Sequence, residues 1–326
     1  MKNILVTGGA GFIGSHVCKI LKEQKFNPIT FDNLSEGNKN LIKWGPFVHG
    51  DLRSKKDLKK VFNKFKIYSV MHLAAKAIVS ESLENIYDYY ENNVFGTLNL
   101  LEVMKEFDLK KIVFSSTCAI YGKAKSQKID ENCKFNPINV YGETKKINEE
   151  ILQNFDKAFD FKYVSLRYFN ACGADLNLQA GELRKNETHL IPLVFNSILK
   201  NKVFHIFGND YNTNDGTCIR DYIHVNDIAR AHFKSLKLLD RSNKSEFFNL
   251  GTGKGLSVLQ VIKLIEKLTK KKIKYVFKNR RYGDPQKLVA DSSKIKKKLN
   301  FEYKYSNPYI IIQSAWDWFI KNNKLT

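Results

Sequence analysis

Tyr141 and Lys145 are the residues whose types and spacing are best suited to chemistry. They form a YxxxK pattern, and this i, i+4 spacing places both side chains on one face of a helix. An ammonium group beside a phenol favours phenolate and lowers the tyrosine pKa, so Tyr141 is a candidate general base. The apolar run Lys111–Ser115 continues to Thr117, whose hydroxyl can bond the same substrate oxygen. These three side chains predict a site that takes a proton from a substrate hydroxyl.

A glycine-rich segment near the N-terminus predicts a dinucleotide site. The apolar run Asn3–Thr7 leads directly into Gly8-Gly9-Ala10-Gly11-Phe12-Ile13-Gly14, a GxxGxxG arrangement that opens a helical pattern. Such glycines let the backbone turn tightly and approach a pyrophosphate, which then meets the free N–H groups at the helix start. Asp32 ends the next apolar run, where a carboxylate accepts hydrogen bonds from the adenosine ribose and repels a 2′-phosphate. The segment therefore predicts NAD rather than NADP.

Two further segments follow apolar runs of strand length. Asp51 comes after Phe47-Val48, and its carboxylate can bond an adenine amino group. The small residues of His72-Leu73-Ala74-Ala75 leave room for the cofactor backbone. We expect His72 itself to be a core histidine and not a catalytic one.

The elements that must position these residues alternate along the first half of the chain. Near-continuous apolar runs are typical of strands buried on both faces of a parallel sheet, and amphipathic segments lie between them. The expected strands are 3–7, 28–31, 69–73, 111–115 and 163–166, and the expected helices are 13–21, 55–65, 89–104 and 141–155. This alternation predicts an α/β fold with a doubly wound parallel sheet of the Rossmann-like kind.

The rest of the chain predicts a smaller C-terminal α/β lobe that binds the substrate. Loops rich in Gly and Asn are followed by expected helices at 191–200 and 258–268, a strand at 273–277 and an aromatic helix at 309–319. We expect a first domain over 1–170 and a second over 171–326, with the chain crossing back to the first around 220–250.

Length and composition indicate a folded protein with room for a cleft between two lobes. The chain has 326 residues, 43% of them hydrophobic, and a formal net charge of +21. Only eight of the 54 basic residues are Arg, and the 46 Lys are spread along the whole chain. A nucleic-acid surface usually needs Arg or aromatic residues interleaved with Lys on one element. We therefore expect a solvated surface and no nucleic-acid partner.

The cysteines and the apolar segments bear on location. The five cysteines are widely spaced without a CxxC pair, so neither a disulfide framework nor a zinc site is expected, and no other metal is predicted. No stretch approaches the length of a membrane span or a signal sequence. The sequence predicts a cytoplasmic protein without a membrane partner.

Several segments carry a family resemblance that covers the chain from Leu5 to about Leu299. The most discriminating are Phe207–Tyr211 and Asp215–Val225, supported by Tyr89–Thr97, Leu166–Asn170 and Arg280–Asp284. With the motifs above, the chain resembles the extended short-chain dehydrogenase/reductase family, and within it the epimerases that act on UDP-sugars. The resemblance implies NAD-dependent inversion at C4 of a UDP-hexose through a transient 4-keto sugar, and a homodimer formed by the helices at 89–104 and 141–155.

The resemblance also implies which residues do what. Catalysis falls to Thr117, Tyr141 and Lys145. Cofactor contacts fall on Gly8, Gly11, Phe12, Ile13, Gly14, Asp32, Asn33, Asp51, Leu52, Leu73, Ala74, Ala75, Asn92, Ser115, Tyr141, Lys145 and Phe169. Substrate contacts fall on Thr117, Asn170, His189, Leu190, Phe207, Arg220, Arg281, Asp284 and Leu288.

Two of these positions depart from the family pattern. His189 stands where Asn is frequent, which changes the donor geometry and keeps a polar contact. Leu288 stands where the family has either Tyr or a small residue beside the sugar, and Tyr is associated with exclusion of N-acetylated sugars. Leu is intermediate in bulk, so the sequence leaves open whether N-acetylated UDP-sugars are substrates.

Three alternative functions remain to be weighed. The nearest alternative is a nucleotide-sugar 4,6-dehydratase or a decarboxylase. A dehydratase of this family usually has Asp-Glu after the catalytic Thr, whereas Cys118-Ala119 follows Thr117 in this chain. A non-catalytic NAD-binding regulator tends to lose the Tyr or the Lys, and this chain keeps both. A nucleic-acid binder has the charge in its favour and lacks a recognition motif.

Overall fold

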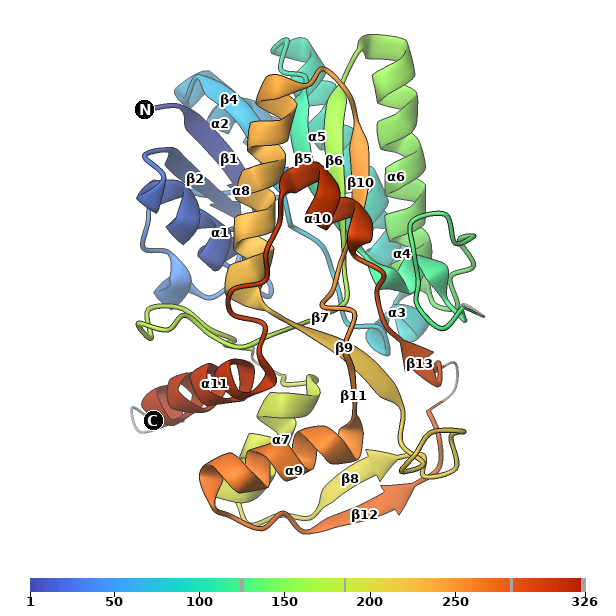
Figure 1. The fold of residues 1–326 in the computed structure, drawn as a ribbon. Helices are drawn as coiled ribbons and strands as arrows, with labels where there is room; N and C mark the ends of the chain where they lie inside the picture. The colour runs from blue at the N-terminus through green and yellow to red at the C-terminus, as the bar shows by residue number, and fades with distance from the viewer. Residues whose placement is uncertain (124–125, 185, 282–283, 324–326) are drawn as a thin grey trace.

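A seven-stranded parallel sheet forms the larger part of the molecule (Figure 1). The computed structural model describes residues 1–123, 126–184, 186–281 and 284–323. The strand order is β10-β6-β5-β4-β1-β2-β3, and each of these neighbouring pairs is parallel. The strands are β1 Asn3–Thr7, β2 Asn27–Asp32, β3 Phe47–His49, β4 Ile67–His72, β5 Lys111–Thr117, β6 Lys162–Tyr168 and β10 Glu246–Leu250. The predicted doubly wound parallel sheet is confirmed.

Helices cover both faces of this sheet, which explains why its strands are continuously apolar. Ile4 and Val6 of β1 belong to one buried cluster with residues of α1 and α8, whereas Leu5 points to the other face, into a cluster with residues of α2, α5 and α6. The helices are α1 Phe12–Glu23 and α8 Val225–Arg241 on one face, and α2 Lys55–Lys64, α5 Gly96–Glu106 and α6 Val140–Phe159 on the other. Because successive side chains of β1 point to opposite faces of the sheet, the apolar core forms two layers, one on each face.

The helix expected over 89–104 is interrupted. It consists of α4 Ile86–Tyr89, a π-helical turn at Tyr90–Phe95, and α5. The π turn holds Asn93, which is 1% exposed, and its side chain bonds the backbone N–H and C=O of Lys76. Its carbonyl accepts hydrogen bonds from Thr97 Oγ1 and Asn148 Nδ2. Side chains of α5 and α6 therefore bind this carbonyl within the wider turn.

The second lobe is built around β9 Ile219–His224. β11 Gly255–Ser257 pairs with it antiparallel, and β7 Asn170–Cys172 and β13 Lys287–Leu288 pair with it in parallel. A separate parallel pair consists of β8 Phe204–Phe207 and β12 Tyr275–Lys278. The remaining helices of this lobe are α7 Leu190–Leu199, α9 Val258–Thr269 and α11 Pro308–Asn323, which share one apolar core.

The chain returns to the seven-stranded sheet between the elements of the second lobe. After β9 it forms α8, then β10 at the sheet edge beside β6, and later α10 Ser293–Leu299, whose Ile295 lies in the same buried cluster as residues of α8 (Figure 1). Short elements complete the chain, namely 3₁₀ turns at Lys39–Leu41 and Cys118–Tyr121 and helix α3 at Glu81–Glu84. The chain therefore passes between the two lobes several times.

Candidate active site

The start of α6 and the end of β5 bring the three predicted catalytic residues together. Asn139 caps α6 by accepting a hydrogen bond from the Gly142 N–H (2.8 Å), so Tyr141 lies in the first turn. Lys145 is 2% exposed and donates from Nζ to the Ser115 carbonyl (2.8 Å). The side chain of Thr117 hydrogen-bonds the Tyr141 hydroxyl. The proton-transfer group expected from the sequence is therefore present as a cluster.

The ionisation of this cluster differs from the expectation. Burial raises the pKa of Tyr141 to about 12, although the hydrogen bond from Thr117 opposes the rise. Burial also lowers the pKa of Lys145 to about 7, against the charge of Glu149. The prediction of a lowered Tyr141 pKa is therefore wrong, because burial outweighs the neighbouring groups that favour the phenolate.

A cavity of about 200 Å³ lies at the glycine-rich turn. Gly8 has φ of +72°, and a Cβ there would lie 2.6 Å from Ala74 N, so only glycine fits this approach of the turn to the end of β4. As at any helix start, the first N–H groups of α1 have no acceptor within the helix and can bind an anion. The predicted cofactor residues that line this cavity are Gly8, Gly11, Phe12, Ile13, Gly14, Asp32, Asn33, Leu52, Leu73, Ala74, Ala75, Asn92 and Ser115. The residues present fit a dinucleotide.

Asp32 is held in place at the end of β2. Its Oδ2 accepts from the Ala10 N–H (3.0 Å) and its Oδ1 from the Leu34 N–H (2.8 Å). The side chain is 8% exposed, and burial raises its pKa. Each carboxylate oxygen can accept more than one hydrogen bond, so a ribose hydroxyl can still bind. This geometry fits the predicted role.

Four predicted cofactor residues are placed elsewhere than in the wall of this cavity. The carboxylate of Asp51 accepts from Arg53 Nε (3.0 Å), Arg53 Nη2 (2.8 Å) and Asn33 Nδ2 (2.9 Å), and Gly50 and Leu52 line the cavity beside it. The Arg53 guanidinium in particular lowers the pKa of Asp51 to about 2. Lys145 Nζ donates to the carbonyl of Ser115, Tyr141 lies one turn earlier on α6, and Phe169 packs in a buried cluster with Cys118 and Ile120. Asp51 thus lies beside the cavity wall with protein donors on its carboxylate, and its contact with an adenine stays a prediction.

A second, larger cavity of about 1060 Å³ lies in the C-terminal lobe. Seven of the predicted substrate residues line it, namely Asn170, His189, Leu190, Phe207, Arg220, Arg281 and Asp284. Arg220 is 9% exposed and forms an ion pair with Asp284. The Arg281 guanidinium lies 4.1 Å from the centroid of the Phe207 ring. Positive charge and an aromatic face therefore share one wall of this cavity, as a nucleoside diphosphate requires.

Two predicted substrate residues do not line the larger cavity. Thr117 is bound to Tyr141, and Leu288 packs against the buried cluster that includes Ile120 and Phe169. The motif Arg280–Asp284 contains Tyr282 and Gly283, which lie outside the described residues. His72 is a core residue as expected, because its ring nitrogens bond Thr7 Oγ1 (2.7 Å) and Thr97 Oγ1 (2.9 Å).

The two cavities meet at the loop before α7, where His189 is the one residue predicted from the sequence. Leu183, Arg184 and His189 line both cavities. Glu182 Oε1 accepts from Arg184 Nε (2.8 Å) and lies 2.6 Å from His189 Nδ1. Glu187 Oε1 accepts from the His189 backbone N–H (2.8 Å). No motif marks these residues, and only the proximity of Glu182, Arg184 and Glu187 to His189 in sequence hinted at them.

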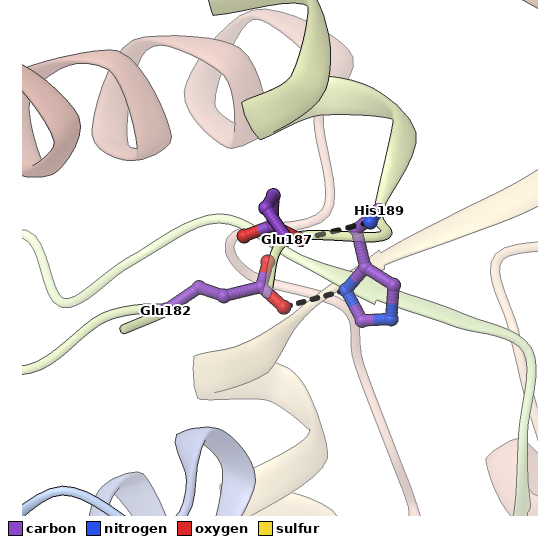
Figure 2. A group of neighbouring side chains, drawn as sticks. All are labelled: Glu182, Glu187 and His189. Atoms are coloured by element: carbon purple, nitrogen blue, oxygen red, sulfur yellow. Dashed lines mark hydrogen bonds and ion pairs between the residues drawn. The ribbon is translucent and has the colours of Figure 1, made fainter. Parts of the chain in front are cut away.

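Figure 2 shows that Glu182 faces the His189 ring and that Glu187 lies at its backbone. The possible ligand atoms of Glu182, Glu187 and His189 lie within 4.8 Å of one another. Both carboxylates are already engaged by protein donors, so we assign no cation to this group.

Among the described residues, none of the helices is long and apolar enough to cross a membrane.

Comparisons with known proteins agree with this geometry. The family model "NAD dependent epimerase/dehydratase family" matches residues 4–251. The chain is 42% identical to a UDP-glucose 4-epimerase of Rhizobium leguminosarum bv. trifolii, with 99% of each chain covered, and 45% identical to one of Halalkalibacterium halodurans, with 97% and 95% covered. The crystal structure of UDP-glucose 4-epimerase from Brucella ovis in complex with NAD superposes with a TM-score of 0.95, at 42% identity and 98% coverage of both chains.

The family match spans more than half of the chain, and these relatives are similar over almost their whole length. The resemblance noted in the sequence is therefore confirmed, and the chain belongs to the NAD dependent epimerase/dehydratase family.

Proposed function

We propose that this protein is an NAD-dependent UDP-glucose 4-epimerase, which inverts C4 of a UDP-hexose through a transient 4-keto sugar. The observation that carries the proposal is the meeting of a dinucleotide cavity and a larger cationic cavity at Leu183, Arg184 and His189. The full-length similarity to UDP-glucose 4-epimerases supports it. A 4,6-dehydratase is disfavoured because the position after Thr117 holds Cys118, whose pKa burial raises to about 12, and no acid or base.

The residues divide the work as follows. When bound, NAD supplies the acceptor and the donor of the hydride. Tyr141, as phenolate, takes the proton of the sugar 4-hydroxyl, and Thr117 hydrogen-bonds the same oxygen. We assign Lys145 to the nicotinamide ribose, because its Nζ donates to the carbonyl of Ser115, a residue that lines the dinucleotide cavity. Arg220 and Arg281 anchor the diphosphate while the 4-keto sugar rotates, so that the opposite face of C4 is presented for the return of the hydride, and Tyr141 gives the proton back to the C4 oxygen.

The direct test is conversion of substrate by the purified protein. UDP-glucose, UDP-N-acetylglucosamine and UDP-arabinose are incubated separately, with and without added NAD, and each C4 epimer is measured by NMR. We expect UDP-galactose from UDP-glucose. Failure to form it even with added NAD would overturn the proposal, and the second and third arms measure how far the site around Leu288 accepts other sugars.

Asp32 sets the cofactor preference, and its replacement should relax it. Asp32→Ala removes the carboxylate that accepts hydrogen bonds from the adenosine ribose, and hydrogen bonds to a charged group contribute about 1.5–3 kcal/mol. We therefore expect the variant to bind NAD about 10- to 100-fold more weakly. NADP binding should weaken less or improve, because the carboxylate no longer repels the 2′-phosphate. Titration calorimetry on NAD-free protein measures both constants. Glu106→Ala, an exposed carboxylate on α5, is the control, and an unchanged NAD-to-NADP ratio in Asp32→Ala would contradict the assignment.

We also propose a homodimer formed through α3, α4, the π turn and α6. Exposed apolar side chains gather on α3, α4 and the π turn, with Tyr87 76% and Phe95 61% exposed, and Leu83 and Ile86 about half exposed. Monomeric proteins rarely expose so many neighbouring apolar groups. Light scattering after gel filtration should give twice the chain mass, and Phe95→Glu should give the single mass. A monomeric wild-type protein at micromolar concentration would refute the dimer.

We also propose the domain bounds and the location. We place the NAD-binding domain at 1–170 and the UDP-sugar-binding domain at 171–326, with the crossing back at 220–250. The seven-stranded sheet and the two cavities support this division. All five cysteines are free thiols, which supports a reducing compartment such as the cytoplasm.

A further inference from the structure

Arg184 lies where the dinucleotide cavity and the substrate cavity meet, and the mechanism above gives it no role. Its side chain is 21% exposed, and the residue lines both cavities. Arg184 Nε donates to Glu182 Oε1 (2.8 Å), and within the described ranges no residue accepts a hydrogen bond from its two Nη groups. A guanidinium has N–H donors on all three nitrogens, so the outer ones remain available to ligands.

The loop that carries this arginine is fixed from both lobes. Trp318 Nε1 of α11 donates to the Glu182 carbonyl (3.0 Å), and Lys43 Nζ of the first lobe donates to the Gln179 carbonyl (2.7 Å). A Cβ on Gly181 would overlap the Trp318 ring, so this ring packs directly on the backbone of the loop. The guanidinium is therefore held at the junction of the cavities by the fold itself.

The charges that line the dinucleotide cavity leave few positive partners for a diphosphate. Three carboxylates line this cavity, those of Asp32, Glu36 and Glu81. Among its described lining residues, the only lysine or arginine besides Arg184 is Lys76, which already forms ion pairs with two carboxylates. The pyrophosphate of a dinucleotide is itself negatively charged, so Arg184 is the arginine available to meet it.

Under the proposed function, the substrate cavity adds a second anionic ligand beside the first. Arg220 and Arg281 line this cavity and not the dinucleotide cavity, and Arg220 pairs with Asp284. Of the lysines and arginines that the structure describes, Arg184 alone lines both cavities. Two anions in adjoining cavities repel one another, and a guanidinium between them binds phosphate oxygens of either through charge-assisted hydrogen bonds.

We propose that Arg184 is a counter-ion shared by the two ligands: its guanidinium binds phosphate oxygens at the junction and offsets the repulsion between the bound dinucleotide and the bound uridine diphosphate group. Arg184 thereby couples the two binding equilibria, so that the protein loaded with NAD keeps its affinity for the uridine nucleotide. This inference deepens the proposed function and rests on it for the identity of the two ligands.

The test measures how strongly each ligand changes the affinity for the other. The full-length protein is titrated calorimetrically with UDP, which has no sugar to epimerise, both at saturating NAD and after removal of NAD. The ratio of the two dissociation constants is the coupling factor, and thermodynamic linkage requires the same factor for NAD with and without UDP. The rate of NAD release from the loaded protein, with and without UDP, gives a second reading that needs no NAD-free protein.

The variants separate a shared contact from a contact with one ligand. Arg184→Met removes the charge, Arg184→Gln removes it and keeps a donor for Glu182, and Arg184→Lys keeps a positive charge. Arg281→Met is the matched control, because Arg281 lines the substrate cavity alone. The indole NMR signal of Trp318, identified with Trp318→Phe, reports whether the loop keeps its place.

Loss of the shared charge should weaken UDP binding most when NAD is present. In Arg184→Met and Arg184→Gln, we expect the affinity for UDP to fall about tenfold more in the NAD-loaded protein than in the NAD-free protein. UDP should then speed the release of NAD relative to its effect on the wild type. Arg184→Lys should lose less coupling, because it keeps the charge without the planar fork. Arg281→Met should weaken UDP binding by the same factor with and without NAD.

Each outcome decides the proposal. A loss of affinity for one ligand that is equal with and without the other would show contact with that ligand only and overturn the shared role, as would unaltered binding in both neutral variants. If Arg184→Met shifts the Trp318 signal, Arg184→Gln decides. Coupling that depends on Arg184 in a protein that forms no UDP-galactose would refute the proposed function alone, and an active epimerase whose coupling survives both neutral variants would refute this inference alone.

Discussion

Tyr141→Phe should lower kcat for C4 epimerisation by about 10²–10⁴-fold or more while binding NAD and UDP-sugar with nearly unchanged affinity. The substitution removes the one oxygen that accepts and returns the sugar proton. It leaves the ring and the capped start of α6 in place, and the Thr117 hydroxyl loses a single hydrogen-bond partner. Single-turnover assays and titration calorimetry separate the two effects.

The control for this variant is Tyr275→Phe, which removes a hydroxyl from a phenol on the exposed strand β12. Its kcat should equal that of the wild type. A Tyr141→Phe protein with more than about a tenth of the wild-type kcat would require another base, because general-base catalysis contributes at least two orders of magnitude.

Glu149→Ala should produce the largest loss of stability among the changes considered. Glu149 and Arg167 form a buried ion pair, with side chains 2% and 1% exposed, and Arg167 Nε and Nη2 both donate to the carboxylate. Ser116 Oγ also donates to Glu149 (2.6 Å). Removing one partner leaves an unpaired buried charge, which costs about 3–5 kcal/mol. Urea unfolding at neutral pH measures the free energy of unfolding.

A surface pair provides the comparison. Lys55 and Glu102 form an ion pair with both side chains nearly half exposed, and such pairs contribute about 0–1 kcal/mol. Glu102→Ala should therefore change stability little. A loss below about 1 kcal/mol in Glu149→Ala would mean that water or another group replaces the partner of Arg167. The double variant Glu149→Leu with Arg167→Leu should lose less than the two single losses added together, because it leaves neither charge unpaired.

The sequence predicted those parts of the molecule that depend on local patterns. Strands buried on both faces leave continuous apolar runs, so β1, β2, β4, β5 and β6 could be found within a few residues. The glycine turn and Asp32 are set by backbone geometry and strand ends. Tyr141 and Lys145 share a helix face at i, i+4, and Thr117 ends the adjacent strand. Each of these signals lies within one element or at its end.

Other features depend on contacts between distant segments and left no such signal. The ionisation of Tyr141 and Lys145 is governed by burial, which spacing in sequence does not report. The ion pair of Asp51 with Arg53 depends on the fold of the turn after β3, which the residue pattern does not report. The partnership of Glu149 and Arg167 joins α6 to β6, and neither residue was singled out.

The helix α8, Val225–Arg241, was not among the helices expected from the sequence. Ile228, Leu236 and Leu239 have helical spacing and are buried. The pattern is obscured by His232, a polar residue that the fold also buries, where its ring bonds the Tyr168 hydroxyl. The spacing of apolar residues therefore shows only part of the buried face of α8. The polar His232 is buried on the same face because Tyr168 of β6 forms a hydrogen bond with its ring.

The position of β10 at the edge of the seven-stranded sheet constrains how the chain can fold during its synthesis. The strand Glu246–Leu250 pairs with β6, and Tyr121 OH donates to the Asn249 side chain (2.7 Å) while accepting from Arg167 Nη1 (2.7 Å). When only the first half of the chain has emerged from the ribosome, the edge of β6 has no strand to pair with. The buried hydrogen bonds from Arg167 to Tyr121 to Asn249 are then also incomplete. The N-terminal half must therefore wait, with an open strand edge, until residue 250 has emerged, and this interval is when chaperones have the most to protect.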